Sequence, residues 1–364
     1  MTVKKLRWHS TFGLIEVVEP LLCADGALLR AFSASAKVAN RCCSRPLQRV
    51  VTDFGADVAF AQVVDRLAEH YGVLLSESTI RRITQAHAGV MQSALASADP
   101  QWPQQRGVEA VIAQMDGTMV PVVDIDDTQT DRRRGRQLRW QEAKISLSHV
   151  PGSRTLNYGG TVCGSVARAG QQWLGCALTS GLGTNTLVHA VGDGAEWIAT
   201  QCEQQFGANG SYLIDFYHLC SYLSEAAKAL HDDATQAAVW LDEQKLALKQ
   251  TDEQPVLAAL KVHLEATEVL DAATPIRRCY RYMANRPGQF AYRKAIAAGR
   301  PIGSGEIKSA HRYLVQQRLK RPGAWWTPKN AERMLALRLV RANRDWKHYW
   351  ASLGEHSAHE RYAA

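Results

Sequence analysis

The stretch Val108–Thr118, which reads VEAVIAQMDGT, decides how the middle of this 364-residue chain folds. Its apolar run stops at Asp116, a pattern typical of a buried strand that ends in a turn. A second apolar run, Leu187–Gly192, also stops at an aspartate, Asp193. Loops at strand ends hold side chains on a rigid support, so both acids are candidates for chemistry.

The segments around these two runs predict a sheet. Strands are expected at 108–115, 141–150, 154–163, 186–192 and 212–214, and helices at 164–178 and 195–206. This order can build a mixed sheet with helices on its faces, because the first three strands can form a meander. We therefore predict an α/β (mixed α+β) core that begins at 105–218.

The N-terminal part predicts a small β or irregular segment at 1–44, with one short strand at 11–18. Over 45–99 apolar residues recur at helical spacing, Gly72 ends one helix, and Ser76 supplies a cap for the next. This order indicates a helix-turn-helix, a motif that binds DNA. A plain helical hairpin gives the same pattern and is somewhat more frequent.

The second half of the chain is mostly helical in pattern. Residues 219–300 are Ala-rich with few breaks and predict an all-helical insertion. A Gly-containing loop at 299–305 opens a helix over about 306–319, and a longer helix is expected over 328–350. The segment 301–350 then completes the core, and 351–364 is a tail.

Composition excludes several classes of protein. Hydrophobic residues make up 46% of the chain and charged residues 21%, which is ordinary for a folded globular protein. No apolar run is long enough for a membrane span, and no apolar run follows Lys4 and Lys5, so neither a membrane protein nor a secretory signal is expected. The eight cysteines form no CxxC pair, which favours reduced thiols and a cytoplasmic, nucleoid-associated protein. Nucleotide-binding and GxSxG motifs are absent.

The positive charge is concentrated near the C-terminus. The net charge is +8, and residues 301–350 contain eleven Lys or Arg against three acids, which accounts for the whole excess. Tryptophans lie among these cations, and Lys/Arg with aromatic rings suit a polyanion such as DNA. A solvated helix face whose tryptophans lie in the core fits the same pattern equally well.

Three carboxylates suggest a metal-dependent reaction. Asp193 lies 77 residues after Asp116, and Glu306 lies 113 residues after Asp193, at the start of a predicted helix. Carboxylate oxygens are the ligands that Mg²⁺ prefers. Two such ions can clamp both the attacking and the leaving oxygen of a phosphoryl transfer.

Four blocks resemble a known family, and they occur in the family's order: MDGT at 115–118, VGDGAEWI at 191–198, DFYH at 215–218 and IGSGE at 302–306. Over about residues 50–340 the sequence resembles DDE transposases with an RNase H-like core. It looks most like the ISKra (ISKra-four) insertion-sequence family, which is similar in layout to the Mutator-like transposases. The resemblance implies an RNase H-like mixed sheet flanked by helices.

The resemblance also implies an activity and its residues. Asp116, Asp193 and Glu306 match the catalytic triad, which would bind Mg²⁺ (or Mn²⁺), nick DNA at the element ends and join them to target DNA. Asp215 and His218 match an accessory block; they either form a buried pair, position the Glu306 helix or contact a displaced strand. The expected partners are the terminal inverted repeats, target DNA and further copies of the chain, with no membrane.

Basic and polar residues in the predicted helices and in an Arg-rich loop are the DNA-binding candidates. They are Arg81, Arg82, Gln85, Arg132, Arg133, Arg134, Arg136, Lys308, Arg312, Arg318, Lys320, Arg321, Arg338 and Arg341.

The sequence departs from the family in one respect. Relatives are expected to carry a cysteine-based zinc module near the N-terminus, whereas this chain has only Cys23 and the adjacent Cys42 and Cys43 there. Apart from this departure, two rival functions stay open. One is a non-catalytic DNA-binding regulator, decayed or domesticated from a transposase, and the other is an RNase H-like nuclease that cuts without joining.

Overall fold

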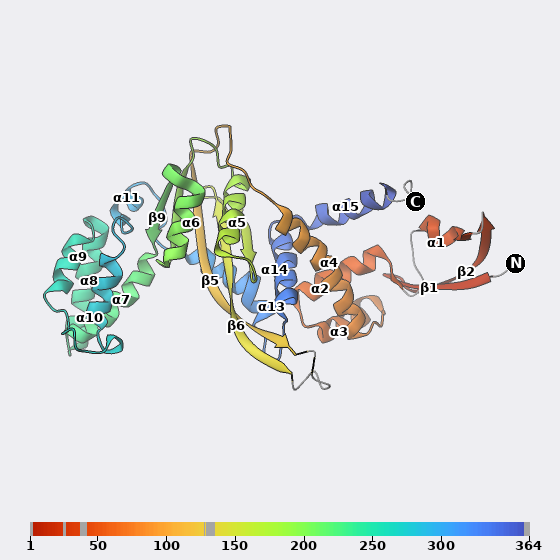
Figure 1. Ribbon diagram of the computed structural model, residues 1–364, viewed down its shortest axis with the longest axis horizontal. Coiled ribbons are helices and arrows are strands. Elements are labelled where there is room, and N and C mark those ends of the chain that lie inside the picture. Colours follow the sequence, from red (N-terminus) through yellow and green to blue (C-terminus); the bar gives the residue numbers. More distant parts are fainter. Residues whose placement is uncertain (1–2, 25–26, 37–41, 127, 129–134, 360–364) are drawn as a thin grey trace. The chain divides into compact units, whose positions relative to one another are not determined.

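The computed structural model describes residues 3–24, 27–36, 42–126, 128 and 135–359 (Figure 1). The chain divides into two compact units, called unit 1 and unit 2 below. Unit 1 comprises Met1–Ala98, Pro121–Arg139 and Leu314–Ala364, and unit 2 comprises Asp99–Val120 and Trp140–Tyr313. Helices and strands are mixed throughout, which confirms the predicted α/β class.

Unit 2 contains most of a five-stranded mixed sheet in the order β7-β6-β5-β8-β9; the last residues of β5 and the first of β6 belong to unit 1. β5 pairs parallel with β8, β8 pairs parallel with β9, and β6 pairs antiparallel with β7. The predicted mixed sheet, with its three consecutive neighbouring strands, is confirmed. The strands are β5 (Ala110–Ile125), β6 (Arg136–His149), β7 (Asn157–Thr161), β8 (Leu187–Gly192) and β9 (Gly210–Ile214).

Helices α5 (Val166–Thr179) and α6 (Glu196–Phe206) pack on one face of this sheet (Figure 1). Val111 and Met115 of β5 are buried in the core that these helices form. Side chains along a strand alternate between its faces, so Gln114 and Asp116 lie on the opposite face. That face of the sheet carries the candidate site.

An all-helical segment follows β9, as the sequence predicts. Its helices bury leucines and aromatic rings in one shared apolar core, which includes Leu223, Leu260 and Tyr292. Figure 1 shows the longer helices packed side by side. The elements are α7 (Phe216–Leu230), α8 (Ala234–Gln250), α9 (Gln254–Lys261), α10 (Pro275–Ala284) and α11 (Tyr292–Ala297), with the short 3₁₀ turn η2 (Asp271–Ala273) before α10.

Three helices of unit 1 form the region predicted as a helix-turn-helix. They are α2 (Arg45–Asp57), α3 (Phe60–Tyr71) and α4 (Glu77–Ser97). Gly72 ends α3 with φ +61°, a left-handed conformation that glycine adopts without strain. The Ser76 side chain caps α4 by accepting a hydrogen bond from the Thr79 N–H at 3.2 Å. The predicted turn and cap are therefore confirmed.

The N-terminus contains more strand than the sequence predicts. Instead of one strand at 11–18, a hairpin pairs β1 (Val3–Ser10) with β2 (Gly13–Ala24), and β3 (Ala27–Arg30), β4 (Cys42–Cys43) and helix α1 (Ala31–Ala36) follow. The sheet order is β3-β2-β1-β4. Leu6 and Trp8 are the buried apolar side chains of β1, and with Lys4 and Lys5 before them this alternation is too short to predict a strand.

The C-terminal helices begin with α12 (Gly305–Ala310), which continues through a π-helix η3 (His311–Gln316) into α13 (Gln317–Leu319). The prediction of a single helix over 328–350 is wrong, because two helices occupy this range. α14 (Pro328–Ala342) ends, Arg344 takes φ +68°, and α15 (Trp346–His359) starts anew. Within the described residues, no helix has the length and apolarity that crossing a membrane requires.

Arginines from the C-terminal helices donate hydrogen bonds to the last carbonyls of α2. The last carbonyls of a helix have no partners inside it, and α2 has no basic residue in its own last turn. Arg318 Nε donates to the Gly55 carbonyl at 3.1 Å, and Arg338 Nη1 donates to the Ala56 carbonyl at 2.5 Å. These cations also oppose the partial negative charge at this helix end.

His87 of α4 is held neutral by its surroundings. The Gln48 amide donates to the Cys43 carbonyl at 2.7 Å, which turns its Oε1 toward His87 Nε2 at 2.9 Å. His87 Nε2 therefore donates, and Nδ1 accepts from the Tyr349 hydroxyl at 2.7 Å. Burial, and then the charge of Arg45, lowers the pKa of His87 from 6.5 to about 4.

We expect unit 1 to lose stability in acid through His87. The folded-state pKa lies below the unfolded value, so the contribution is complete above about pH 6.5 and falls away as the pH drops toward 4. The loss should be about 3 kcal/mol, at 1.36 kcal/mol per unit. Denaturant unfolding at pH 7 and pH 4.5 measures this loss as a difference in the free energy of unfolding. His87→Gln should reduce the difference between the two pH values, whereas His263→Gln, at an exposed position, should not. An unchanged difference in His87→Gln would contradict the prediction.

Candidate functional site

The position of Asp116 differs from the sequence prediction. The expectation that its strand ends there is wrong, because β5 continues to Ile125. The neighbouring strand is what ends: the last β5–β8 pair is Gln114 with Val191. Asp116 therefore lies just beyond the point where β8 stops pairing with β5. Its carboxylate lies at this edge of the sheet, called the rim below, although its own strand continues.

Asp193 follows β8 directly, as predicted, and three side chains hold its loop. The Tyr282 hydroxyl donates to the Asp193 carbonyl at 2.6 Å, Arg286 Nε donates to the Gly194 carbonyl at 2.8 Å, and the Gly194 N–H donates to the Tyr212 oxygen at 3.1 Å. The Asp193 carboxylate itself accepts from the Ala195 N–H at 2.9 Å, at the start of α6. The loop backbone is thus rigid where it presents this acid.

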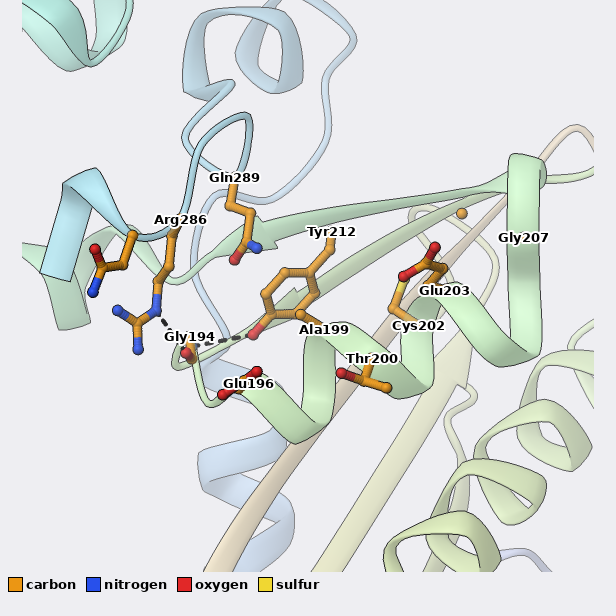
Figure 2. Close-up of a pocket in the computed structure, with 12 residues that line it drawn as sticks. Gly194, Glu196, Ala199, Thr200, Cys202, Glu203, Gly207, Tyr212, Arg286 and Gln289 are labelled. Atoms are coloured by element: carbon orange, nitrogen blue, oxygen red, sulfur yellow. Dashed lines mark hydrogen bonds between the residues drawn. The ribbon is translucent and has the colours of Figure 1, made fainter.

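A cavity of 680 Å³ lies beside this loop (Figure 2). Figure 2 shows Tyr212 and Arg286 both bonded to Gly194, with Glu196 at the start of α6. Gly194 has φ +87°, so a side chain there would be strained. Three residues of this cavity, Gly194, Tyr212 and Arg286, thus shape the loop that carries Asp193.

Glu306 begins α12 and is bound to β5. The Gln114 amide donates to Glu306 Oε2 and accepts from the Ile307 N–H at 3.0 Å. Gln114 is fully buried and lies two residues before Asp116, on the same face of the strand. The tertiary structure thus brings Glu306 next to the strand segment that carries Asp116.

A histidine at the end of β6 also holds Glu306. His149 Nε2 lies 3.2 Å from Glu306 Oε2, and its Nδ1 lies 2.9 Å from the Val150 carbonyl. Both partners only accept, so both ring nitrogens must carry a proton for both bonds to form. Burial opposes the charge, but these bonds outweigh it and raise the pKa of His149.

Asp116 and Asp193 interact electrostatically. Burial, and then the negative charge of Asp193, raise the pKa of Asp116 to about 6, while the Gly117 N–H and Lys308 act in the opposite direction. Two carboxylates that resist simultaneous ionisation are a typical feature of a cation or proton site. The ring of His311, in the π-helix, lies 3.9 Å from Asp116.

Asp215 supports the helix that carries Glu306. One of its oxygens caps α7 through the Tyr217 N–H at 2.8 Å, and the other accepts from Ser304 Oγ at 2.5 Å and Lys308 Nζ at 2.7 Å. Burial raises its pKa, but these donors outweigh it, so the pKa of Asp215 is lowered. Of the readings left open, positioning the Glu306 helix fits this geometry, and the His218 ring instead packs near Tyr222 and Tyr282.

The acids fit a divalent cation only in part. Among the residues that the structure describes, no group of three or more His, Cys, Asp or Glu stands together in a way that would hold a metal ion. The negative charge of Asp193 acts on Asp116, and one or two carboxylates with waters and substrate phosphates can hold Mg²⁺. Glu306 is directed to Gln114 and His149; its side chain is 40% exposed.

The basic candidates separate into exposed and buried groups. Arg81, Arg82, Arg136 and Arg312 are exposed. Arg318 and Arg338 are buried, each 3% exposed, so the prediction that they contact phosphates is wrong. They are buried because the carbonyls at the end of α2 need donors.

The remaining candidates are occupied by contacts within the protein or lie outside the described residues. Lys308 binds Asp215, Arg321 donates to Gln62 at 3.0 Å, and Arg341 pairs with Asp53. Lys320 is partly buried, and Gln85 is only 9% exposed, which rules out groove reading by Gln85 in this conformation. Arg132, Arg133 and Arg134 fall outside the described residues.

Two positioning residues were missed from the sequence. Gln114 is the one polar residue between Ala110 and Met115, in the apolar run before Asp116, and a buried polar side chain needs partners, so it carried a signal. His149 lies at a strand end and carried none, because its partner is 157 residues away.

Comparison with known proteins identifies one partial match. Residues 183–348 match the model of an uncharacterised protein family, UPF0236. The matched segment includes Asp193, Asp215 and Glu306 but not Asp116. No curated protein matches the chain.

Proposed function

We propose that the chain is a DDE-type transposase, an enzyme that cleaves DNA at the ends of a mobile element and joins them to target DNA. The observation that carries the proposal is that Asp116, Asp193 and the Glu306 helix belong to one rim of a mixed sheet. Asp116 and Asp193 are electrostatically coupled, and Glu306 binds Gln114, two residues from Asp116.

In this proposal Asp116 and Asp193 hold a divalent cation, Mg²⁺ or Mn²⁺. Bound there, such an ion stabilises charge on the oxygens that attack and leave the phosphorus. The negative charge of Asp193 is one cause of the raised pKa of Asp116, and a bound cation would offset that charge. Glu306, whose side chain is 40% exposed, would complete the triad after its carboxylate leaves Gln114 and His149.

The supporting residues hold these acids in place. Asp215 anchors the first turn of α12 through Ser304 and Lys308, and the Tyr282 hydroxyl holds the Asp193 backbone. Rigid placement matters because phosphoryl transfer depends chiefly on positioning and charge stabilisation.

DNA binding is assigned to the exposed cations. Arg81 and Arg82 lie on α4, the second helix of the helix-turn-helix pattern, where long donors reach groove edges or phosphates. Arg312 is a further exposed cation on the helical segment that carries Glu306 and Lys308.

The proposal is tested with the full chain and labelled duplexes from the DNA that flanks its gene. With Mg²⁺ or Mn²⁺ we expect nicks at the element ends, followed by joined products with a second DNA. With EDTA both products should disappear.

The same assay separates the rival functions. Nicks without joined products, even from a pre-cut end, would identify a nuclease. DNA binding without nicks in either metal would identify a non-catalytic regulator. Either result would overturn the transposase proposal.

A further inference from the structure

A second cavity, of 840 Å³, lies within unit 1. It is lined by α3, by α4, by the outer ends of β5 and β6, and by the segment 318–330 that joins α13 to α14. This volume is in the range of pockets that bind small ligands. None of the residues assigned to the candidate active site lines it.

Three buried polar groups line this cavity without partners. Gln85 Oε1, Arg318 Nη2 and Trp326 Nε1 have no hydrogen-bond partner among the described residues. Their side chains are 9%, 3% and 5% exposed. Buried polar groups are nearly always paired, so three such atoms on residues that line one cavity are candidate partners for a ligand or for solvent. One is an acceptor and two are donors.

Aromatic rings provide the apolar part of the cavity. Phe60 and Trp326 meet edge to face with centroids 6.3 Å apart, and the Arg318 guanidinium lies 4.7 Å from the Trp326 centroid. Trp325 is 57% exposed at the mouth. A large exposed ring at the mouth of a cavity is a surface on which a planar ligand can stack.

Cations surround the mouth. Arg81, Arg136 and Arg321 all line the cavity, against one acid, Glu77. The Arg136 guanidinium lies 5.9 Å from the Trp325 centroid, and Arg81 pairs with Glu77 only loosely, at 3.5 Å with both side chains half exposed. The mouth therefore favours an anion beside a flat ring.

We propose that this cavity binds one unstacked nucleotide of a DNA substrate. The base stacks on Trp325 and enters toward Gln85, Arg318 and Trp326, whose acceptor and donors suit the edge of a base, while its phosphate meets the cations at the mouth. The proposal deepens the DNA-binding part of the proposed function and rests on it for the choice of DNA over a free nucleotide.

The test compares two labelled duplexes of equal length in EDTA, one fully paired and one with a single bulged 2-aminopurine nucleotide. By fluorescence anisotropy we expect wild type to bind the bulged duplex about tenfold more tightly. Trp325→Ala and Gln85→Leu should remove this preference and leave affinity for the paired duplex unchanged. Trp140→Ala, at an equally exposed tryptophan (59%) in unit 2, should keep it.

Equal wild-type affinity for the two duplexes, or a variant that weakens both equally, overturns the proposal. A further experiment adds a deoxynucleoside monophosphate as a competitor of the bulged duplex. If it displaces the bulged duplex at micromolar concentration, the cavity is a free-nucleotide site and the DNA assignment is overturned; failure to compete at millimolar concentration supports it. The binding test in EDTA is independent of the nicking assay with Mg²⁺ or Mn²⁺. If the chain prefers the bulged duplex in EDTA but does not nick DNA with either metal, only the proposed transposase activity is overturned. Nicking without the preference overturns only this inference.

Discussion

Asp193→Asn is expected to lower the rate of nicking at element ends at least about 10³-fold while DNA affinity stays unchanged. A carboxylate that holds a catalytic cation contributes several kcal/mol of transition-state stabilisation, and each 1.36 kcal/mol is tenfold in rate. The asparagine should not disturb folding, because its side-chain oxygen can still accept from the Ala195 N–H. Single-turnover nicking and a binding isotherm measure the two effects.

Asp233→Asn is the matched control. Asp233 also caps a helix, by accepting from the Gln236 N–H at 2.8 Å, but it belongs to the helical segment α8. It removes one charge and keeps the cap, so wild-type nicking is expected. If Asp193→Asn nicks at the wild-type rate, Asp193 has no place in the triad.

A second measurement on Asp193→Asn does not depend on activity. In metal-free protein the pKa of Asp116, followed by NMR, should fall from about 6, because the charge of Asp193 is one cause of its elevation. An unchanged pKa would show that the two carboxylates do not interact, and that the rim lacks the proposed cation pair.

Arg338→Met is expected to destabilise unit 1 by about 3 kcal/mol, the second large effect. The Arg338 guanidinium donates to the carbonyls of Ala56 and of Leu314, and it pairs with Asp57 at 3.0 Å. Methionine keeps the length of the side chain and leaves those buried carbonyls without that donor. Thermal and denaturant unfolding, followed by circular dichroism, measure the loss.

Lys329→Met is the control for charge. Lys329 is an exposed cation on the same helix, α14, so its replacement should change stability by less than about 0.5 kcal/mol. If Arg338→Met folds as stably as wild type but loses DNA affinity with a weaker salt dependence, then Arg338 contacts phosphates after all.

Local patterns were enough for much of the core. Apolar runs located β8 and the first part of β5, and Gly72 with Ser76 located the turn between α3 and α4. These signals depend on neighbours within a few residues, which is why a single sequence shows them. The hairpin of β1 and β2 was largely missed, because its pairing depends on strands that meet only in the fold.

The candidate site was predictable as a list of acids and not as an arrangement. Asp116 was assigned to the end of a strand, but its position depends on where the neighbouring strand β8 ends. The bond between Gln114 and Glu306 joins residues 192 positions apart, and no local pattern encodes it. The role of Asp215 in holding α12 became visible only through its contacts with Ser304 and Lys308.

From sequence came the kinds of elements, their order and the three acids, because apolar periodicity, caps and turn residues act over a few positions of the chain. Only the tertiary structure decided which arginines are exposed and which are buried. Eleven cations in 301–350 look alike in sequence, yet Arg312 is exposed while Arg318 and Arg338 are buried. What separates them is the end of α2, more than 250 residues earlier, whose unpaired carbonyls need donors that a local pattern does not reveal.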